Sequence, residues 1–124
     1  MRSRSLALVA VLILVACGGG EDEPRAISGE AVTVKMLDTS FEFDQITIPV
    51  GGSVTFVGTS NAIPHNAVAA DGSWSTETVF GSLEQYDGDE ATLTFDEPGE
   101  YVFYCTFHGN PRGGGMAGTL IVEG

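Results

Sequence analysis

The sequence has few positive charges, few cysteines and few histidines. Only five lysines and arginines stand against 17 aspartates and glutamates in its 124 residues, which gives a formal net charge of −12. A surface so poor in positive charge excludes nucleic acid as a partner and favours encounter with a basic protein, although a salty habitat would also explain it. The two cysteines and two histidines restrict any metal or reactive site to a small set of side chains.

Long apolar runs are also missing. Leu6–Ala16 is the most prominent apolar run, and its eleven residues are too few to cross a bilayer as a helix. Because Arg2 and Arg4 precede it, the segment is typical of a signal peptide over residues 1–16. The sequence Leu14-Val15-Ala16-Cys17 resembles the lipobox of bacterial lipoproteins, which implies cleavage before Cys17 and a diacylglycerol group on its sulfur. The alternative is an ordinary secretory signal in which Cys17 has no role.

Lipidation of Cys17 would leave Cys105 as the only free thiol of the mature chain. No disulfide could then form, and iron–sulfur ligation, which needs more cysteines, would be excluded. A single cysteine in an exported protein is a reactive thiol, an intermolecular bridge or a metal ligand. Metal binding would explain how it survives in an oxidising compartment, because coordination deprotonates and shields the sulfur.

The mature chain divides into a tether and one domain. Residues 17–29 begin with the lipidated cysteine and continue as a glycine-rich, acidic stretch without apolar periodicity, which predicts a flexible tether. From residue 30 to 124, apolar residues alternate with polar ones in short runs separated by turn signals such as Asp71-Gly72 and Pro98-Gly99. The alternating positions are Val32, Val34 and Met36; Ile46, Ile48 and Val50; Val54 and Phe56; Leu93 and Phe95; Tyr101, Phe103 and Cys105; and Leu120 and Val122.

This pattern predicts an all-β domain of seven to eight strands, arranged as an antiparallel sandwich of two sheets. No stretch predicts a helix of useful length. Ser73–Gln85 is the least regular segment and is compatible with a short strand, a loop or one helical turn.

Four residues form a candidate metal site. The run Gly99–His108 carries Cys105 near its end, and His108 follows three residues later. Met116 lies beyond a glycine-rich loop, and His65 supplies a second imidazole from Pro64-His65-Asn66. Taken alone, a lone cysteine is more often a small buried hydrophobe, and a lone histidine more often a core or surface residue. Together, two imidazoles, one thiolate and one weak thioether are the ligand set of a type 1 copper site.

On these residues the chain resembles the cupredoxins, most closely the small plastocyanin-like and halocyanin-like members. The resemblance covers most of the chain from about Ala31 onward. It implies a cupredoxin-like Greek-key β-sandwich with one type 1 copper held by His65, Cys105, His108 and Met116. It further implies a monomeric electron carrier and no enzyme. The expected role is to shuttle single electrons between redox proteins such as c-type cytochromes or membrane electron-transfer complexes, at the extracytoplasmic face of the membrane that holds the lipid anchor.

Three alternatives remain open. Zinc could occupy His₂Cys with water, although no carboxylate adjoins either histidine to act as a general base. A copper-delivery lipoprotein would pass on the metal itself, and a plain sandwich module would use neither metal nor electrons. Multicopper oxidase chemistry is excluded because a trinuclear cluster needs many histidines.

The resemblance also assigns roles to neighbouring residues. Asn66 is expected to tie the histidine loop to the cysteine strand by hydrogen bonds, and Tyr104 to point away from the ligand face. An apolar patch around His108 would comprise Ile63, Pro64, Phe107 and Pro111. The seven residues between His108 and Met116 exceed the usual plastocyanin loop, a departure that concerns the assignment of Met116 as the axial ligand.

Overall fold

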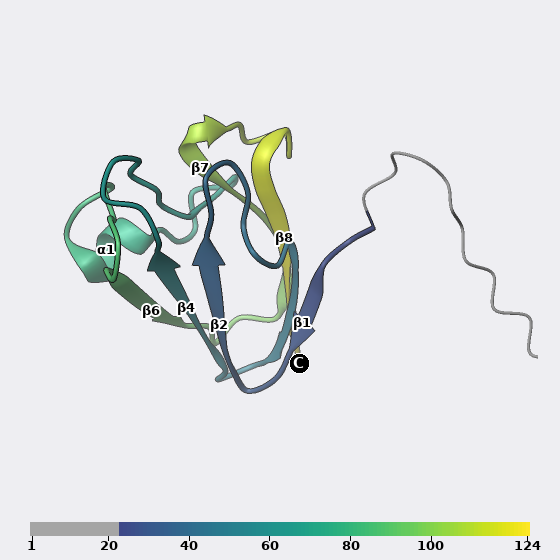
Figure 1. Cartoon of the computed structure of the whole chain (residues 1–124). Helices are drawn as coiled ribbons and strands as arrows, with labels where there is room; N and C mark the ends of the chain where they lie inside the picture. The colour runs from purple at the N-terminus through teal and green to yellow at the C-terminus, as the bar shows by residue number, and fades with distance from the viewer. Residues whose placement is uncertain (1–22) are drawn as a thin grey trace, which may run out of the picture.

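The computed structural model describes residues 23–124, which form two β-sheets packed face to face (Figure 1). The three-stranded sheet has the order β2-β4-β6, from β2 (Ala31–Met36), β4 (Ser53–Gly58) and β6 (Glu90–Thr94). The five-stranded sheet has the order β1-β3-β8-β7-β5. Its strands are β1 (Ala26–Ser28), β3 (Gln45–Pro49), β5 (Val68–Ala69), β7 (Gly99–Gly109) and β8 (Gly115–Glu123).

The core lies between the two sheets and contains the inward-facing residues of the alternating runs. In β2, Val32, Val34 and Met36 are buried while the residues between them are exposed, as a period-2 pattern requires. Phe41, Phe56 and Phe103 meet edge to face at the centre, with ring centroids 4.8–5.9 Å apart. The predicted all-β sandwich of seven to eight strands is therefore confirmed.

The expected antiparallel pairing is wrong for part of each sheet. Three strand pairs are parallel: β1 with β3, β2 with β4, and β3 with β8. The pairs β4–β6, β5–β7 and β7–β8 are antiparallel. Alternation of apolar and polar residues reports which face is buried but is the same for both strand directions, so it could not distinguish them.

The irregular segment Ser73–Gln85 contains α1 (Thr76–Phe80), one of the three possibilities considered for it. The Ser75 side chain accepts the backbone N–H of Glu77 at the start of the helix. Gly81, at φ 91°, ends the helix in the left-handed conformation that glycine favours. No helix of residues 23–124 is long and apolar enough to cross a membrane.

A strand lies within the C-terminal part of the predicted tether, residues 17–29. Ala26–Ser28 forms β1 and pairs in parallel with Gln45–Thr47 at the edge of the larger sheet. Arg25 reinforces this contact, because its backbone N–H donates to Asp44 Oδ1 at 2.9 Å. A strand of three residues is too short to show as alternation in the sequence. The predicted signal peptide, Cys17 and the first tether residues lie outside the described residues.

Candidate metal centre

Cys105 and His108 lie on β7 where its pairing with β8 becomes irregular. Regular pairing runs up to Tyr104, opposite Ala117, and resumes at Gly109, opposite Gly115. Four residues of β7, Cys105–His108, therefore face the single residue Met116 of β8. A bulge of this kind bends the strand and re-aims its side chains. Phe107 turns outward and is 47% exposed, whereas His108 turns back toward the buried Cys105.

The structure brings together three of the four predicted ligands through their donor atoms. The Sγ atom of Cys105 lies 3.8 Å from Nδ1 of His65 and 3.6 Å from Nδ1 of His108. The ligand atoms of these three residues all lie within 4.8 Å of one another. His65 and Cys105 are fully buried, and His108 is half-buried. Of these three residues, His108 is the one that is partly exposed to solvent.

These separations fit a metal ion placed between the three atoms. With bonds of about 2.3 Å to sulfur and about 2.0 Å to nitrogen, an angle of 120° separates sulfur from nitrogen by about 3.7 Å. The observed values of 3.6 and 3.8 Å lie on either side of this distance. One thiolate and two imidazoles are the strong donors of a type 1 copper site.

His65 is held by a short antiparallel bridge to Gln85. The His65 backbone N–H donates to the Gln85 carbonyl oxygen at 3.1 Å, and the Gln85 N–H donates back to the His65 carbonyl oxygen at 3.0 Å. Burial lowers the pKa of His65, the nearby His108 lowers it further, and the carboxylate of Asp38 opposes both effects. The ring therefore favours the neutral form, which is the form that binds metal.

Met116 occupies the place on β8 next to Cys105. The register of β7 and β8 pairs Phe103 with Gly118 and Tyr104 with Ala117, so a continued ladder would bring Cys105 opposite Met116. Both side chains are buried and belong to the same core cluster. Residues opposite each other in a ladder point to the same face of the sheet. The backbone thus places the thioether on the side of β7–β8 that carries the thiol.

Asn66 ties the His65 loop to the Cys105 strand, as the resemblance implied. Its side chain is fully buried. Its Nδ2 donates to Thr106 Oγ1 at 2.8 Å and to the Leu83 carbonyl oxygen at 3.0 Å. The Thr106 backbone N–H donates in return to Asn66 Oδ1 at 2.9 Å. The loop and the strand, forty residues apart, are thereby fixed to each other beside the two ligands.

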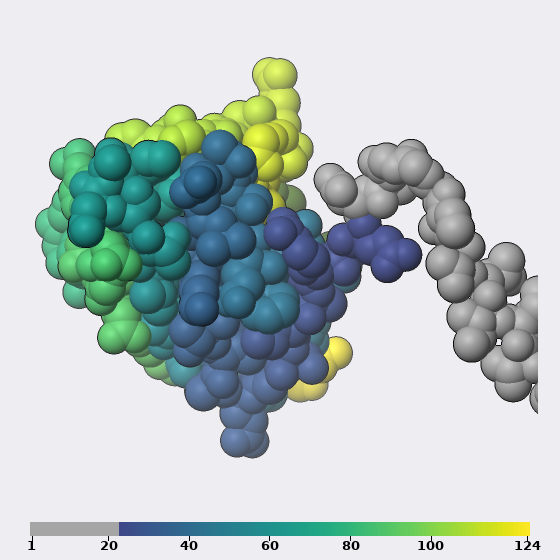
Figure 2. Space-filling model, viewed as in Figure 1, coloured from purple at the N-terminus to yellow at the C-terminus, as the bar shows by residue number. Residues whose placement is uncertain are grey.

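The surface around His108 is partly apolar. Phe107 and Pro111 are exposed, and Ile63 and Pro64 are half-buried. The yellow-green loop between β7 and β8 projects from the body at the top of Figure 2. Tyr104 is half-buried between the inward-facing Phe103 and Cys105, so alternation directs it away from the ligand face as expected.

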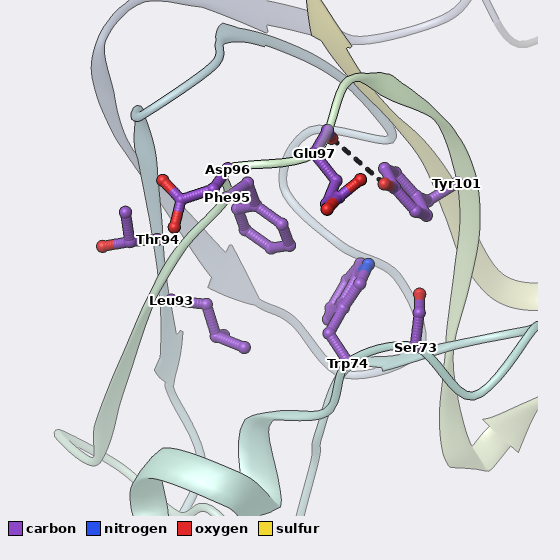
Figure 3. Close-up of a pocket in the computed structure, with 8 residues that line it drawn as sticks. All are labelled: Ser73, Trp74, Leu93, Thr94, Phe95, Asp96, Glu97 and Tyr101. Carbon is purple, nitrogen blue, oxygen red and sulfur yellow. Dashed lines mark hydrogen bonds between the residues drawn. The ribbon is translucent and has the colours of Figure 1, made fainter.

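A cavity of about 350 Å³ lies near the start of β7 and is separate from these ligands. Figure 3 shows the rings of Trp74, Phe95 and Tyr101 around it, with the Tyr101 hydroxyl donating to the Glu97 carbonyl oxygen at 3.1 Å. The residues lining it within the described chain carry no imidazole or thiol: Ser73, Trp74, Leu93, Thr94, Phe95, Asp96, Glu97 and Tyr101. It therefore supplies no ligand of the candidate centre.

Sequence reasoning missed Gln85 and Thr106 as parts of the site. Gln85 is a fully buried polar residue whose backbone pairs with His65, and Thr106 receives the Asn66 side chain. A polar residue in an irregular segment carries no periodic signal. For Thr106, its place beside Cys105 was the one available hint.

Comparison with known proteins agrees with this geometry. The model of the family described as copper binding proteins, plastocyanin/azurin family, matches residues 29–123. The chain is 35% identical to the chloroplastic plastocyanin of Tetradesmus obliquus, covering 98% of this chain and 85% of that protein. A reduced amicyanin variant superposes with a TM-score of 0.56 at 27% identity, over 83% of this chain and 94% of the variant. A copper-containing nitrite reductase from Thermus scotoductus matches with a TM-score of 0.59 at 29% identity, over 89% of this chain but only 25% of the reductase.

Proposed function

Because the chain belongs to the plastocyanin/azurin family of copper-binding proteins, we propose that it is a type 1 copper electron carrier. The observation that carries the proposal is the position of the Cys105 sulfur, 3.6 and 3.8 Å from the Nδ1 atoms of two histidines. Copper bound there would supply reversible one-electron chemistry between Cu(I) and Cu(II). Thiolate suits Cu(I), and imidazole suits both oxidation states.

In this proposal His65, Cys105 and His108 hold the metal, and Met116 is the weak axial ligand. The three strong donors lie in a rigid setting, because Cys105 belongs to β7 and Asn66 fixes the His65 loop to it. A rigid site needs little rearrangement when the electron arrives or leaves. The half-buried His108, next to the exposed Phe107, is the route by which the electron enters and leaves at an apolar docking surface.

The proposed partners are redox proteins such as c-type cytochromes or membrane electron-transfer complexes. Plastocyanins and an amicyanin are among the relatives, and the net charge of −12 favours a basic partner. The lipobox-like sequence ending at Cys17 supports a lipid anchor on the extracytoplasmic face of the membrane. The protein is proposed to act as a monomer. We propose no enzymatic role, since the match to the nitrite reductase extends over only a quarter of that protein.

The test is the visible and paramagnetic spectrum of the copper-loaded protein. Thiolate bound to Cu(II) in this geometry gives an intense visible charge-transfer band, which the Cys105→Ser variant should lose while it binds copper in an ordinary tetragonal mode. A blue colour that persists in this variant would overturn the assignment. Rapid electron self-exchange with copper retained supports the carrier, whereas ready transfer of Cu(I) to an apo acceptor would favour copper delivery.

A further inference from the structure

Two buried polar atoms near the metal centre lack hydrogen-bond partners among the described residues. One is Nε2 of His65, on the far side of the ring from the atom that faces Cys105. The other is Oε1 of Gln85. Both residues have 0% exposure. An unpaired buried polar atom is costly, so each of these atoms calls for a partner.

The orientation of the Gln85 amide is fixed by its own hydrogen bonds. Its Nε2 donates to the carbonyl oxygen of Phe56 at 3.2 Å and to that of Asp89 at 3.3 Å. Carbonyl oxygens only accept, so the NH₂ group must face them and the amide oxygen must point elsewhere. Gln85 Oε1 is therefore a buried acceptor without a hydrogen-bond donor among the described residues.

His65 and Gln85 are also direct neighbours. Their backbones exchange two N–H···O bonds, at 3.1 and 3.0 Å, as an antiparallel hydrogen-bonded pair. The two Cα atoms of such a pair lie about 5.5 Å apart, and the side chains leave the backbone on the same face. Two buried side chains thus start side by side, one with an unpaired nitrogen and the other with an unpaired oxygen.

We propose that Gln85 is a positioning residue for His65, whose Nε2–H donates to Gln85 Oε1 when Nδ1 binds the metal. This inference rests on the proposed function only in that Nδ1 of His65 is the ligand atom. Metal on Nδ1 requires the proton to be on Nε2, and the hydrogen bond would hold both this tautomer and the tilt of the ring. An acceptor on the second nitrogen also raises the basicity of the ligand nitrogen.

The chain offers a matched pair of variants for the test. Gln85→Leu removes both the acceptor oxygen and the NH₂ donor, whereas Gln85→Glu removes only the donor and keeps an oxygen toward His65. Both variants lose the two hydrogen bonds that the Gln85 NH₂ group donates to Phe56 and Asp89, so they share this loss and differ in the acceptor oxygen and in the charge of the carboxylate. The folded state of each apo variant is checked by its amide NMR spectrum.

The first readout uses the apo and Cu(I)-loaded proteins and requires no electron transfer. Nitrogen-15 NMR of the imidazoles gives the tautomer of His65 and the exchange rate of its Nε2 proton. In the parent and in Gln85→Glu, we expect the Nε2–H tautomer with a protected proton. In Gln85→Leu, we expect proton exchange to be about tenfold faster and the tautomer preference to weaken. Unchanged exchange and tautomer in Gln85→Leu would overturn the proposal and identify a water or a backbone carbonyl as the acceptor.

The second readout is the copper equilibrium. Losing such an outer partner typically costs 10–100-fold in metal affinity, and Gln85→Leu should fall in this range. A less basic imidazole weakens Cu(II) more than Cu(I), so a tenfold difference between the two would raise the potential by about 59 mV. Gln85→Glu should shift the potential the opposite way. Potentials that move together in both variants would show a purely structural role. If the parent gives no type 1 spectrum, the proposed function fails, whereas the His65 tautomer of the Cu(I)-loaded protein still tests the Gln85 contact.

Discussion

The Asn66 side chain should contribute several kilocalories per mole to the free energy of unfolding, although it binds no metal. The Asn66→Leu substitution keeps the volume of the side chain and removes its three hydrogen bonds, two to Thr106 and one to Leu83. Each typical intramolecular hydrogen bond contributes about 1 kcal/mol net. Because the Asn66 side chain is fully buried, the Thr106 N–H and the Leu83 carbonyl that it leaves unpaired can form hydrogen bonds to water only in part. The expected loss is therefore about 3 kcal/mol.

The assay is urea unfolding of the apo protein, which keeps copper affinity out of the measurement. For a slope of about 1.5 kcal/mol per molar urea, a loss of about 3 kcal/mol lowers the midpoint by about 2 M. Thr106→Val is the matched control, since it removes only the 2.8 Å bond from Asn66 Nδ2 and should cost about 1 kcal/mol. In the Asn66→Leu background the same change should cost almost nothing, because its partner is already gone. Two results would refute this account of how Asn66 joins the loop to the strand. One is a double variant whose loss of stability equals the sum of the two single losses, and the other is an Asn66→Leu loss no larger than that of Thr106→Val.

The other predictions concern the axial ligand, the loop and the anchor. Met116→Leu should keep copper and stay blue with a raised potential, and Met116→Gln should lower it, since a weak axial donor tunes the site without holding the metal; unchanged potentials would assign the axial position to another group. Gly109→Ala would press its Cβ against the Met116 carbonyl and should therefore shift the reduction potential. Gly113→Ala is the control: nothing lies within 4 Å of its Cβ, so it should lower stability only through its φ of 90°. Equal potentials in the two variants would contradict this expectation. Cys17→Ser should move the native protein from the membrane fraction to the soluble one, because stable attachment needs the diacyl group; a variant that stays membrane-bound would exclude lipidation as the anchor.

Many of the strands could be predicted from the sequence, because burial of one face of a strand produces an alternation of apolar and polar residues. Val32, Val34 and Met36 all face the core, and alternation alone predicts this for each of them. The parallel pairing of β2 with β4 produces no such pattern, since alternation does not depend on strand direction. The short β1 was missed for a related reason. Three residues at a sheet edge, with only Ile27 partly buried, are too few to show a period.

The candidate ligands were predictable because their chemistry is rare in this chain. Two histidines and one cysteine beyond residue 17 left few combinations, and the structure brings all three together. Gln85 was not predictable in this way. Glutamine is common at surfaces, and only the bridge to His65 places this amide inside the protein. The groups that orient ligands therefore need the fold before they can be found.

Strict alternation would also have mispredicted the orientation of the two residues that follow the cysteine. Counting by two from the buried Cys105 sends Phe107 inward and His108 outward. The structure has the opposite arrangement, with Phe107 47% exposed and His108 Nδ1 3.6 Å from the thiol. The cause is the bulge of four residues opposite Met116, which the sequence does not reveal.

The same bulge bears on the prediction that Met116 is the axial ligand. The loop between His108 and Met116 has seven residues, which is longer than the usual plastocyanin loop. In the structure Gly109 pairs with Gly115, so the loop closes at its base before Met116 begins. Asn110 closes it further, because its Oδ1 accepts the backbone N–H groups of Arg112 and Gly114 at 2.9 and 3.2 Å. Because the Gly109–Gly115 pair closes the loop, extra loop residues lengthen only the part that projects beyond this pair. The position of Met116 is set by the ladder instead, since Met116 is the single β8 residue between Gly115 and Ala117, both of which pair with β7.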